Sequence, residues 1–557
     1  MKKNLFTVSF LISTLFCVSQ TLNINISKDH FKIDQTRSLI ISHIENIESF
    51  ADLTSYTEVI LFLDQVAYSF NTLPDSVTYK QSYTISNNSN QFTLYFTSLP
   101  IISIETANTI VDEPKVLANF VYADSEQIVT SKIGIEIRGG SSQSYPKKTY
   151  DLEFWEDNNG EDTHNVEFGS LRSDDDWILD ALYNEPLRLR SYIANKLWLK
   201  LHTPYYLPVE PEAKAGANVD YTEIFLNGEY NGIYNLSEQV DKKQLKLKSY
   251  KDDIRGELYK GIAWGPAVFA SLPDFDNNSR IWGGHEMKYP KEDDVTDWNN
   301  LYDFTDFVIN STDSDFVNNI WSKFNYDNYL DYFLFLNVLR ATDNTGKNIY
   351  IAKYNTNEPY FYVPWDLDGC FGTIWNGTNQ NITGDILING FHNRVIELNP
   401  QNYLTDVSNK WLNHRNNNLK TNVLIDSIDK QYLFLSENKI YERESLIYPN
   451  YDFNEVDLLY MKTWIQNRLS YLDNYFQTLS LNHIDSTKSI LYPNPATNKI
   501  NIKYKKNLAN KKYAIHNFLG QLVKKGELKS HSINIETLQQ GNYIITLNNN
   551  YYKLIVK

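Results

Sequence analysis

The sequence predicts an α+β protein with three folded regions. Short alternating runs broken by turn residues fill 20–99 and predict a small β-rich domain. Strand patterns mix with apolar helical runs over 100–480, which predicts a larger core containing both strands and helices. Alternating runs return over 488–557, after a polar linker at 481–487, and predict a compact Ig-like β-sandwich.

The composition excludes several classes of protein. The 557 residues include 52 basic and 68 acidic side chains, so the formal net charge is −16. Binding to nucleic acid needs clustered Lys and Arg, and we therefore expect no nucleic-acid partner. The chain has two cysteines, Cys17 and Cys370, too few for a disulfide framework or a cysteine-based zinc site.

The first 19 residues predict a secretory signal peptide. Two lysines precede an apolar run over 5–18, and the small residue Ser19 offers a cleavage site. The run is shorter than the roughly 20 residues that a membrane-spanning helix needs. A lipoprotein signal is disfavoured because Phe16 stands where a small residue is required. We expect an exported mature chain without a transmembrane segment.

Individual elements of the first two regions follow from periodicity. The N-terminal domain contains predicted strands at 57–63 and 92–96. In the core, strands are predicted at 133–137, 150–154 and 349–354, and helices at 187–201 (after Pro186), 329–339 and 458–479. No period of 20–50 residues repeats, which argues against a solenoid or propeller.

The C-terminal region resembles the type A sorting domain of the type IX secretion system of Bacteroidota. The resemblance rests on Tyr-Pro-Asn-Pro-Ala at 492–496, Gly-Gln-Leu-Val at 520–523, Gly-Asn-Tyr-Ile-Ile at 541–545 and the basic end at 553–557. It implies that the protein interacts with the type IX machinery and is secreted or displayed on the cell surface.

A group of polar residues follows the helix predicted at 329–339. Asp343 and Asn348 lie five residues apart, and Asp366 and Asp368 follow the next strand. The same Asp–Asn spacing occurs in the catalytic loop of protein kinases, where such residues orient the acceptor hydroxyl and hold divalent metal. The alternative is that Asp343 is a solvated loop residue.

A glycine-containing loop lies upstream, between the strands at 133–137 and 150–154. Its residues run from Arg138 through Gly139, Gly140 and Ser141 toward Lys147 and Lys148, and small residues let backbone amides approach phosphate. Strand alternation places Lys148 on the apolar face and Lys147 on the polar one, so Lys148 is the better candidate for a nucleotide contact. The alternative is a hairpin turn with two surface lysines.

Together these segments resemble the spore-coat protein H (CotH) kinase family. The matching stretches, in the family's order, are 138–142, 146–150, 175–179, Arg190, 226–234 with Glu238, 343–348 and 364–369. The resemblance implies an atypical two-lobed protein-kinase-like fold. It also implies that the protein binds ATP with Mg²⁺ or Mn²⁺ and phosphorylates Ser or Thr on secreted or surface proteins.

The resemblance also implies roles for individual residues. Asp343 corresponds to the catalytic aspartate, and the metal ligands would be Asn348, Asp366 and Asp368. Nucleotide contacts would come from Arg138, Gly139, Gly140, Ser141, Lys147 and Lys148. Glu238 would either pair with the lysine or lie near the adenine edge.

Several ordinary kinase motifs are missing. No His-Arg precedes Asp343, no Gly-x-Gly-x-x-Gly or Asp-Phe-Gly occurs, and the helix predicted at 187–201 offers no carboxylate after Glu185 to pair with a lysine. An alternative function is therefore a catalytically weak or inactive kinase-like surface protein acting in adhesion, or in glycan or matrix binding.

Overall fold

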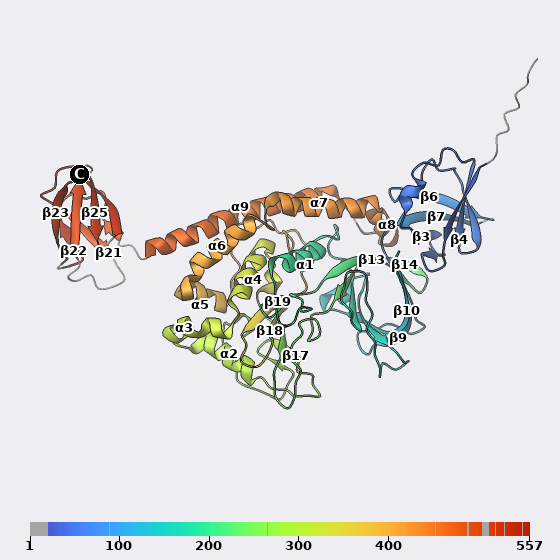
Figure 1. Cartoon of the computed structure of the whole chain (residues 1–557), viewed down its shortest axis with the longest axis horizontal. Helices are drawn as coiled ribbons and strands as arrows, with labels where there is room; N and C mark the ends of the chain where they lie inside the picture. Colours follow the sequence, from blue (N-terminus) through green and yellow to red (C-terminus); the bar gives the residue numbers. More distant parts are fainter. Residues whose placement is uncertain are drawn as a thin grey trace, which may run out of the picture.

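The computed structural model shows a mixed α/β chain whose regions follow one another in space (Figure 1). It describes residues 20–88, 90–264, 266–451, 453–486, 490–503, 512–517, 520–528, 530–547 and 550–557. The predicted signal peptide, residues 1–19, lies outside these. An N-terminal sheet is followed by a β-barrel, a helical region and, beyond a long helix, two small C-terminal sheets.

The N-terminal region is a seven-stranded sheet with the order β1-β4-β5-β6-β7-β3-β2. Alternating residues such as Leu61, Ile85 and Leu94 are fully buried in its core. The strands predicted at 57–63 and 92–96 are confirmed as β4 and β7. The strands are β1 (Thr21–Ile26), β2 (Phe31–Asp34), β3 (Leu39–His43), β4 (Glu58–Leu63), β5 (Val66–Phe70), β6 (Ser82–Asn87) and β7 (Asn90–Thr97).

The next region is a closed barrel with the order β10-β11-β12-β14-β13-β8-β9. Tyr150, Leu152 and Phe154 point into its core beside Trp177, as period-2 alternation requires. The side chains at 151 and 178 therefore face outward. The strands are β8 (Ile101–Glu105), β9 (Val116–Ala123), β10 (Ile128–Arg138), β11 (Thr149–Trp155), β12 (Asp176–Asp180), β13 (Val219–Leu226) and β14 (Glu229–Glu238).

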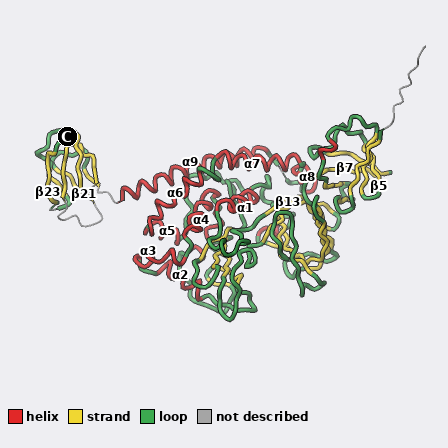
Figure 2. The backbone as a smooth tube through the Cα atoms, in the orientation of Figure 1, coloured by secondary structure: helices red, strands yellow, loops and turns green. Residues whose placement is uncertain are grey.

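The helical region packs on one face of a five-stranded sheet with the order β16-β17-β15-β18-β19, and Figure 2 shows the helices concentrated in this half of the core. The strands are β15 (Glu257–Gly261), β16 (Ile281–Trp282), β17 (His285–Tyr289), β18 (Ile349–Lys353) and β19 (Tyr360–Pro364). The helices are α1 (Arg190–Leu201), α2 (Asn299–Asn310), α3 (Asp313–Lys323), α4 (Tyr326–Leu339), α5 (Gly390–Leu398), α6 (Tyr403–Arg415), α7 (Thr421–Glu437), α8 (Ile440–Ile447) and α9 (Glu455–Ser486).

All three helices predicted in the core are present, with shifted ends. The helix predicted at 187–201 begins only at Arg190, because Arg188 has a left-handed backbone (φ 58°) that a helix cannot include. Buried Glu185 instead accepts the Leu189 amide at 2.6 Å, at the start of the helix. The predicted apolar helix is α4, which is buried almost throughout and is capped by the Asn325 side chain.

The long helix α9 runs to Ser486, through most of the predicted linker. Beyond it lie a three-stranded sheet, β20-β21-β24, and a four-stranded sheet, β23-β22-β25-β26. Their strands are β20 (Ile490–Tyr492), β21 (Lys499–Lys503), β22 (Lys512–Asn517), β23 (Leu522–Glu527), β24 (Ser532–Asn534), β25 (Gly541–Leu547) and β26 (Asn550–Val556). Among the described residues, no helix combines the length and apolar character needed to cross a bilayer.

Candidate active site

The loop after α4 positions Asp343. Arg340 ends the helix with a left-handed backbone, and the short 3-10 turn η4 (Thr342–Thr345) carries Asp343, which is 9% exposed. The neighbouring Asn344 side chain donates to two carbonyls, those of Asn348 and Trp365, each at 2.7 Å. This amide joins the two polar segments that are separated in sequence by the β18–β19 hairpin.

Asp366 follows β19 with a left-handed backbone (φ 55°), and its side chain is exposed. The Trp365 amide donates to the Asn348 carbonyl at 3.2 Å, so Asp366 lies at the same end of the sheet as the Asp343 loop. Burial raises the pKa of Asp343, and the Asp366 charge raises it further. The structure therefore brings Asp343, Asn348 and Asp366 together.

Two more carboxylates complete this group. Asp368 accepts a hydrogen bond from the Asn184 side chain at 2.5 Å. Burial raises the pKa of Asp368 well above its usual value, and the charges of Asp366 and Asp180 add to the effect. Burial, followed by the Asp366 charge, likewise raises the pKa of Asp180 to about 6. We call Asp180, Asp343, Asp366 and Asp368 the carboxylate cluster.

Asn348 has a left-handed backbone (φ 54°) and is 8% exposed. Its backbone amide donates to the Gly261 carbonyl at 3.0 Å, which ties the loop to β15. Its carbonyl is held by Asn344. These backbone contacts fix the position of Asn348 beside the cluster.

The glycine-containing loop between β10 and β11 closes on itself. Gly139 has a φ of 110°, and a Cβ there would collide with the Ser142 hydroxyl, so glycine is required. Gly140 and Ser141 are exposed. Lys148 donates from Nζ to the carbonyls of Gln143 and Tyr145, each at 2.6 Å, and so caps the turn η2 (Ser141–Ser144).

Lys147 is the more buried of the two lysines. Its Nζ donates to Glu444 Oε1 at 2.8 Å and to the Ile233 carbonyl at 2.5 Å. The other oxygen of Glu444, which lies on α8, pairs with Arg188 Nη2 at 2.8 Å. All three side chains are 0% exposed. We call Lys147, Arg188 and Glu444 the buried ion network.

The network holds Glu444 ionised. Burial opposes ionisation, but Lys147 and Arg188 together keep the pKa of Glu444 below its usual value. Burial lowers the pKa of Lys147 to about 8. Strand alternation favoured Lys148 over Lys147 as the nucleotide contact. That alternation does not apply to either lysine, because β11 begins only at Thr149. The helix predicted at 187–201 offered no carboxylate to pair with a lysine, and Glu444 on α8 provides that carboxylate for Lys147.

Arg138 faces the carboxylate cluster from the barrel side. Its guanidinium pairs with Asp151 Oδ2 at 3.1 Å and lies 5.2 Å from the centre of the Trp365 ring, next to Asp366. Glu238 is turned elsewhere: its oxygens accept from the Arg172 and Asn218 amides and from Gln244 Nε2. Glu238 is 1% exposed and bonds to neither of the two lysines.

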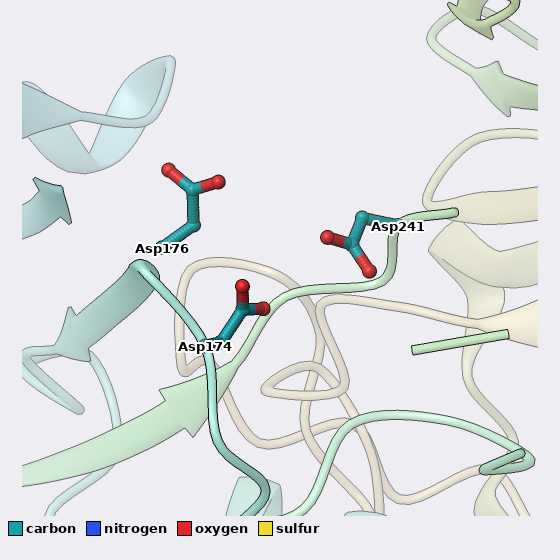
Figure 3. A group of neighbouring side chains, drawn as sticks. All are labelled: Asp174, Asp176 and Asp241. Atoms are coloured by element: carbon teal, nitrogen blue, oxygen red, sulfur yellow. The ribbon is translucent and has the colours of Figure 1, made fainter. Parts of the chain in front are cut away.

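A second acidic group lies on the barrel. Asp176 begins β12, Asp174 lies in the loop just before it, and Asp241 faces them from the segment after β14 (Figure 3), with oxygens of all three within 4.8 Å of one another. This triad could hold a metal ion. Burial raises the pKa of Asp176 to about 7. Lys243, however, already pairs with Asp174 at 3.2 Å.

Sequence reasoning missed Asp180, Glu444 and the acidic triad of Asp174, Asp176 and Asp241. Asp180 directly follows the family-like stretch at 175–179 and ends the same strand, so strand direction could have indicated it. Glu444 lies 297 residues from Lys147, and no spacing rule connects them.

Comparison with known families agrees with this architecture. Residues 135–472 match the family model described as CotH kinase protein, which is more than half of the chain. Residues 490–557 match the model described as a secretion system C-terminal sorting domain. No curated protein matches the chain. Both resemblances expected from the sequence are confirmed.

Proposed function

The chain belongs to the CotH kinase protein family, and we propose that it is a secreted protein kinase acting on Ser or Thr of surface or extracellular proteins. The family implies kinase activity and ATP as the phosphoryl donor. The sorting domain indicates export through the type IX system and interaction with its machinery. The observation that carries the proposal is the carboxylate cluster, in which the charge of Asp366 raises the pKa of Asp180, Asp343 and Asp368 after the larger effect of burial.

The donor set of the cluster fits a hard divalent cation. Carboxylate and amide oxygens are the ligands that Mg²⁺ and Mn²⁺ prefer. Asp366 and Asp368 would hold the metal, with Asn348 assisting. Burial raises the pKa of Asp368 most, and repulsion from Asp366 and Asp180 adds to it; a bound cation would relieve that repulsion. When bound, the metal would neutralise charge on the transferring phosphoryl group.

We assign Asp343 the role of orienting the acceptor hydroxyl and accepting its proton. Its carboxylate is largely buried and its pKa is raised, so it binds a proton more readily than an exposed aspartate. The Asn344 side chain holds this loop against the Asp366 segment. The chain thus keeps the proton acceptor and the metal ligands at fixed relative positions.

The phosphate contacts are assigned to the barrel side. Arg138 faces the cluster, and the exposed residues Gly140 and Ser141 lie in the adjoining loop. Lys148 supports this loop by capping its carbonyls, and Lys147 supports it through the buried ion network. We place the kinase domain at 100–480, between an N-terminal domain at 20–99 and the sorting domain at 488–557.

Thermal unfolding with ATP and Mn²⁺ tests this proposal. A ligand at 100 times its dissociation constant stabilises a protein by about 2.7 kcal/mol, which raises the midpoint by a few degrees. We expect this rise in the wild type and its loss in Asp366→Asn. Asp429→Asn, which removes a surface carboxylate paired with Lys462, is the matched control and should keep the rise. A wild type that shows no rise at millimolar ATP would contradict the proposal.

A further inference from the structure

We infer that Lys260 and Arg138 form a two-sided clamp for the phosphate oxygens of a metal-bound polyphosphate, with Arg138 from the barrel and Lys260 from the five-stranded sheet. The inference rests on the proposed phosphotransfer function. It adds a binding residue, Lys260, that neither the motifs nor their spacing indicated.

Lys260 lies on the face of the sheet that turns toward the candidate site. Along β15, Leu258 packs with Tyr350 and Val363 on one face, whereas Tyr259 packs with the helices on the other. Strand alternation therefore places Lys260 on the Leu258 face. Its cross-strand partner there is Tyr350.

Aromatic contacts connect this face to Arg138. The edge of Trp365 meets Tyr350 with the ring centres 6.0 Å apart, and the Arg138 guanidinium lies over the Trp365 ring. Asp366 is the next residue after Trp365. A ligand held by the metal-binding carboxylates would therefore lie between a cation from β10 and a cation from β15.

Lys260 differs from the other lysines of its sheet in having no counter-ion. Lys288 pairs with Glu286 at 2.9 Å, and Lys353 pairs with Glu257 at 3.0 Å. Within the described part of the chain, no carboxylate oxygen comes within 4 Å of the Lys260 ammonium. Such a half-buried cation is costly unless something compensates its charge, and a ligand anion would do so.

The charges around Lys260 also favour binding of an anion by this side chain. Burial lowers the pKa of Lys260 to about 8, and the charges of Arg138 and Lys288 lower it further. Glu286 and Asp366 oppose this effect without cancelling it. A free anion would be repelled by the carboxylate cluster, so the expected ligand carries its own divalent cation. Those requirements fit a metal-bound nucleoside triphosphate that contacts the clamp through its phosphates, so the clamp itself gives a neutral nucleoside no contact.

Calorimetric titration of the full chain tests the clamp with three probes: ATP with Mn²⁺, inorganic tripolyphosphate with Mn²⁺, and adenosine. The variants are Lys260→Met, Lys260→Arg and, as the matched control, Lys288→Met on the neighbouring strand. Losing one charge-assisted contact should weaken ATP and tripolyphosphate binding by about tenfold or more in Lys260→Met. Lys260→Arg should recover most of this loss, Lys288→Met should bind like the wild type, and adenosine affinity should not change.

The outcomes separate the clamp from the proposed function. Wild-type affinity for ATP in Lys260→Met would overturn the clamp and leave the kinase proposal standing. Equal losses for ATP and adenosine would also overturn the clamp, because Lys260 would then shape the pocket and not bind phosphate. A wild type that binds neither ATP nor tripolyphosphate would overturn both proposals. Should Lys260→Met not fold, Lys260→Gln and Arg138→Met provide the same comparison.

Discussion

The buried ion network and the carboxylate cluster differ in whether their charged side chains are paired. In the network, Glu444 lies between two cations, and both of its oxygens are paired. In the cluster, Asp368 is repelled by the charges of Asp366 and Asp180, and its side-chain hydrogen-bond partner is the neutral amide of Asn184. The network pairs its charges within the chain, whereas no carboxylate of the cluster forms an ion pair with a described residue.

This difference separates a structural role from a functional one. Opposite charges that satisfy each other hold elements together, here α8 against the barrel. Like charges that remain unpaired cost stability, and proteins keep them where a ligand supplies the missing charge. A stabilising role therefore requires paired charges, whereas cation binding requires unpaired carboxylates. The buried ion network and the carboxylate cluster allow the two roles to be tested separately.

The largest expected effect comes from breaking the network. Glu444→Gln leaves Lys147 and Arg188 buried without a carboxylate, and we expect a loss of about 3–5 kcal/mol in the free energy of unfolding. Denaturant titration monitored by circular dichroism measures this loss. The matched control Glu212→Gln removes an exposed carboxylate that pairs with Lys246, and it should leave the free energy of unfolding nearly unchanged. Similar losses of unfolding free energy in Glu444→Gln and Glu212→Gln would contradict a special structural role for the buried ion network.

The cluster should respond with the opposite sign. Asp366→Asn removes one of several repelling charges, so the ligand-free protein should unfold at the same or a higher temperature. The same variant should lose the stabilisation of about 2.7 kcal/mol expected from ATP and Mn²⁺ at 100 times the dissociation constant. Scanning calorimetry of both proteins, with and without ligand, measures the two effects. A variant that is destabilised without ligand would show that Asp366 has a structural role.

The pH dependence of the cluster sharpens the comparison. The folded-state pKa of Asp180, about 6, lies above its ordinary value of 3.8, so its contribution to stability is present at low pH and is lost as pH rises through 6. A bound cation reverses this preference. We expect Mn²⁺ to raise the unfolding midpoint more at pH 7.5 than at pH 5, and Asp180→Asn to reduce the difference. An equal rise of the unfolding midpoint at both pH values would contradict cation binding at the carboxylate cluster.

The smallest effect is expected at the acidic triad. Lys243 and Arg172 already pair with Asp174, so the triad has positive charge of its own. Asp176→Asn should therefore change the stabilisation by ATP and Mn²⁺ less than Asp366→Asn does. Calorimetry under identical conditions compares the two variants. A larger loss in Asp176→Asn would move the proposed metal site from the cluster to the triad.

Local patterns predicted the elements and part of the site. The apolar helix before Asp343 and the strand before Asp366 were predicted from periodicity, and both segments lie at one end of the five-stranded sheet. The sequence predicted the alternation of β11 but not the lysine environments, because Lys147 and Lys148 precede the strand. Where periodicity ends, side-chain direction depends on tertiary packing.

The remaining site residues come from distant parts of the chain. Glu444 reaches Lys147 from α8, and Asp180 reaches Asp366 from the barrel. The closed barrel itself depends on a parallel pairing of β8 with β13, more than 100 residues apart. Such contacts follow from the whole fold and leave no spacing in the sequence from which they could be predicted.

Phosphate transfer itself is the most direct test of the central claim. The measurement is incorporation of labelled phosphate from ATP into Ser or Thr of casein as a generic acceptor, with Mn²⁺, by the wild type and by Asp343→Asn. The account predicts incorporation by the wild type and a loss of at least about 100-fold in Asp343→Asn, with ATP affinity unchanged. Equal incorporation by both proteins would contradict it.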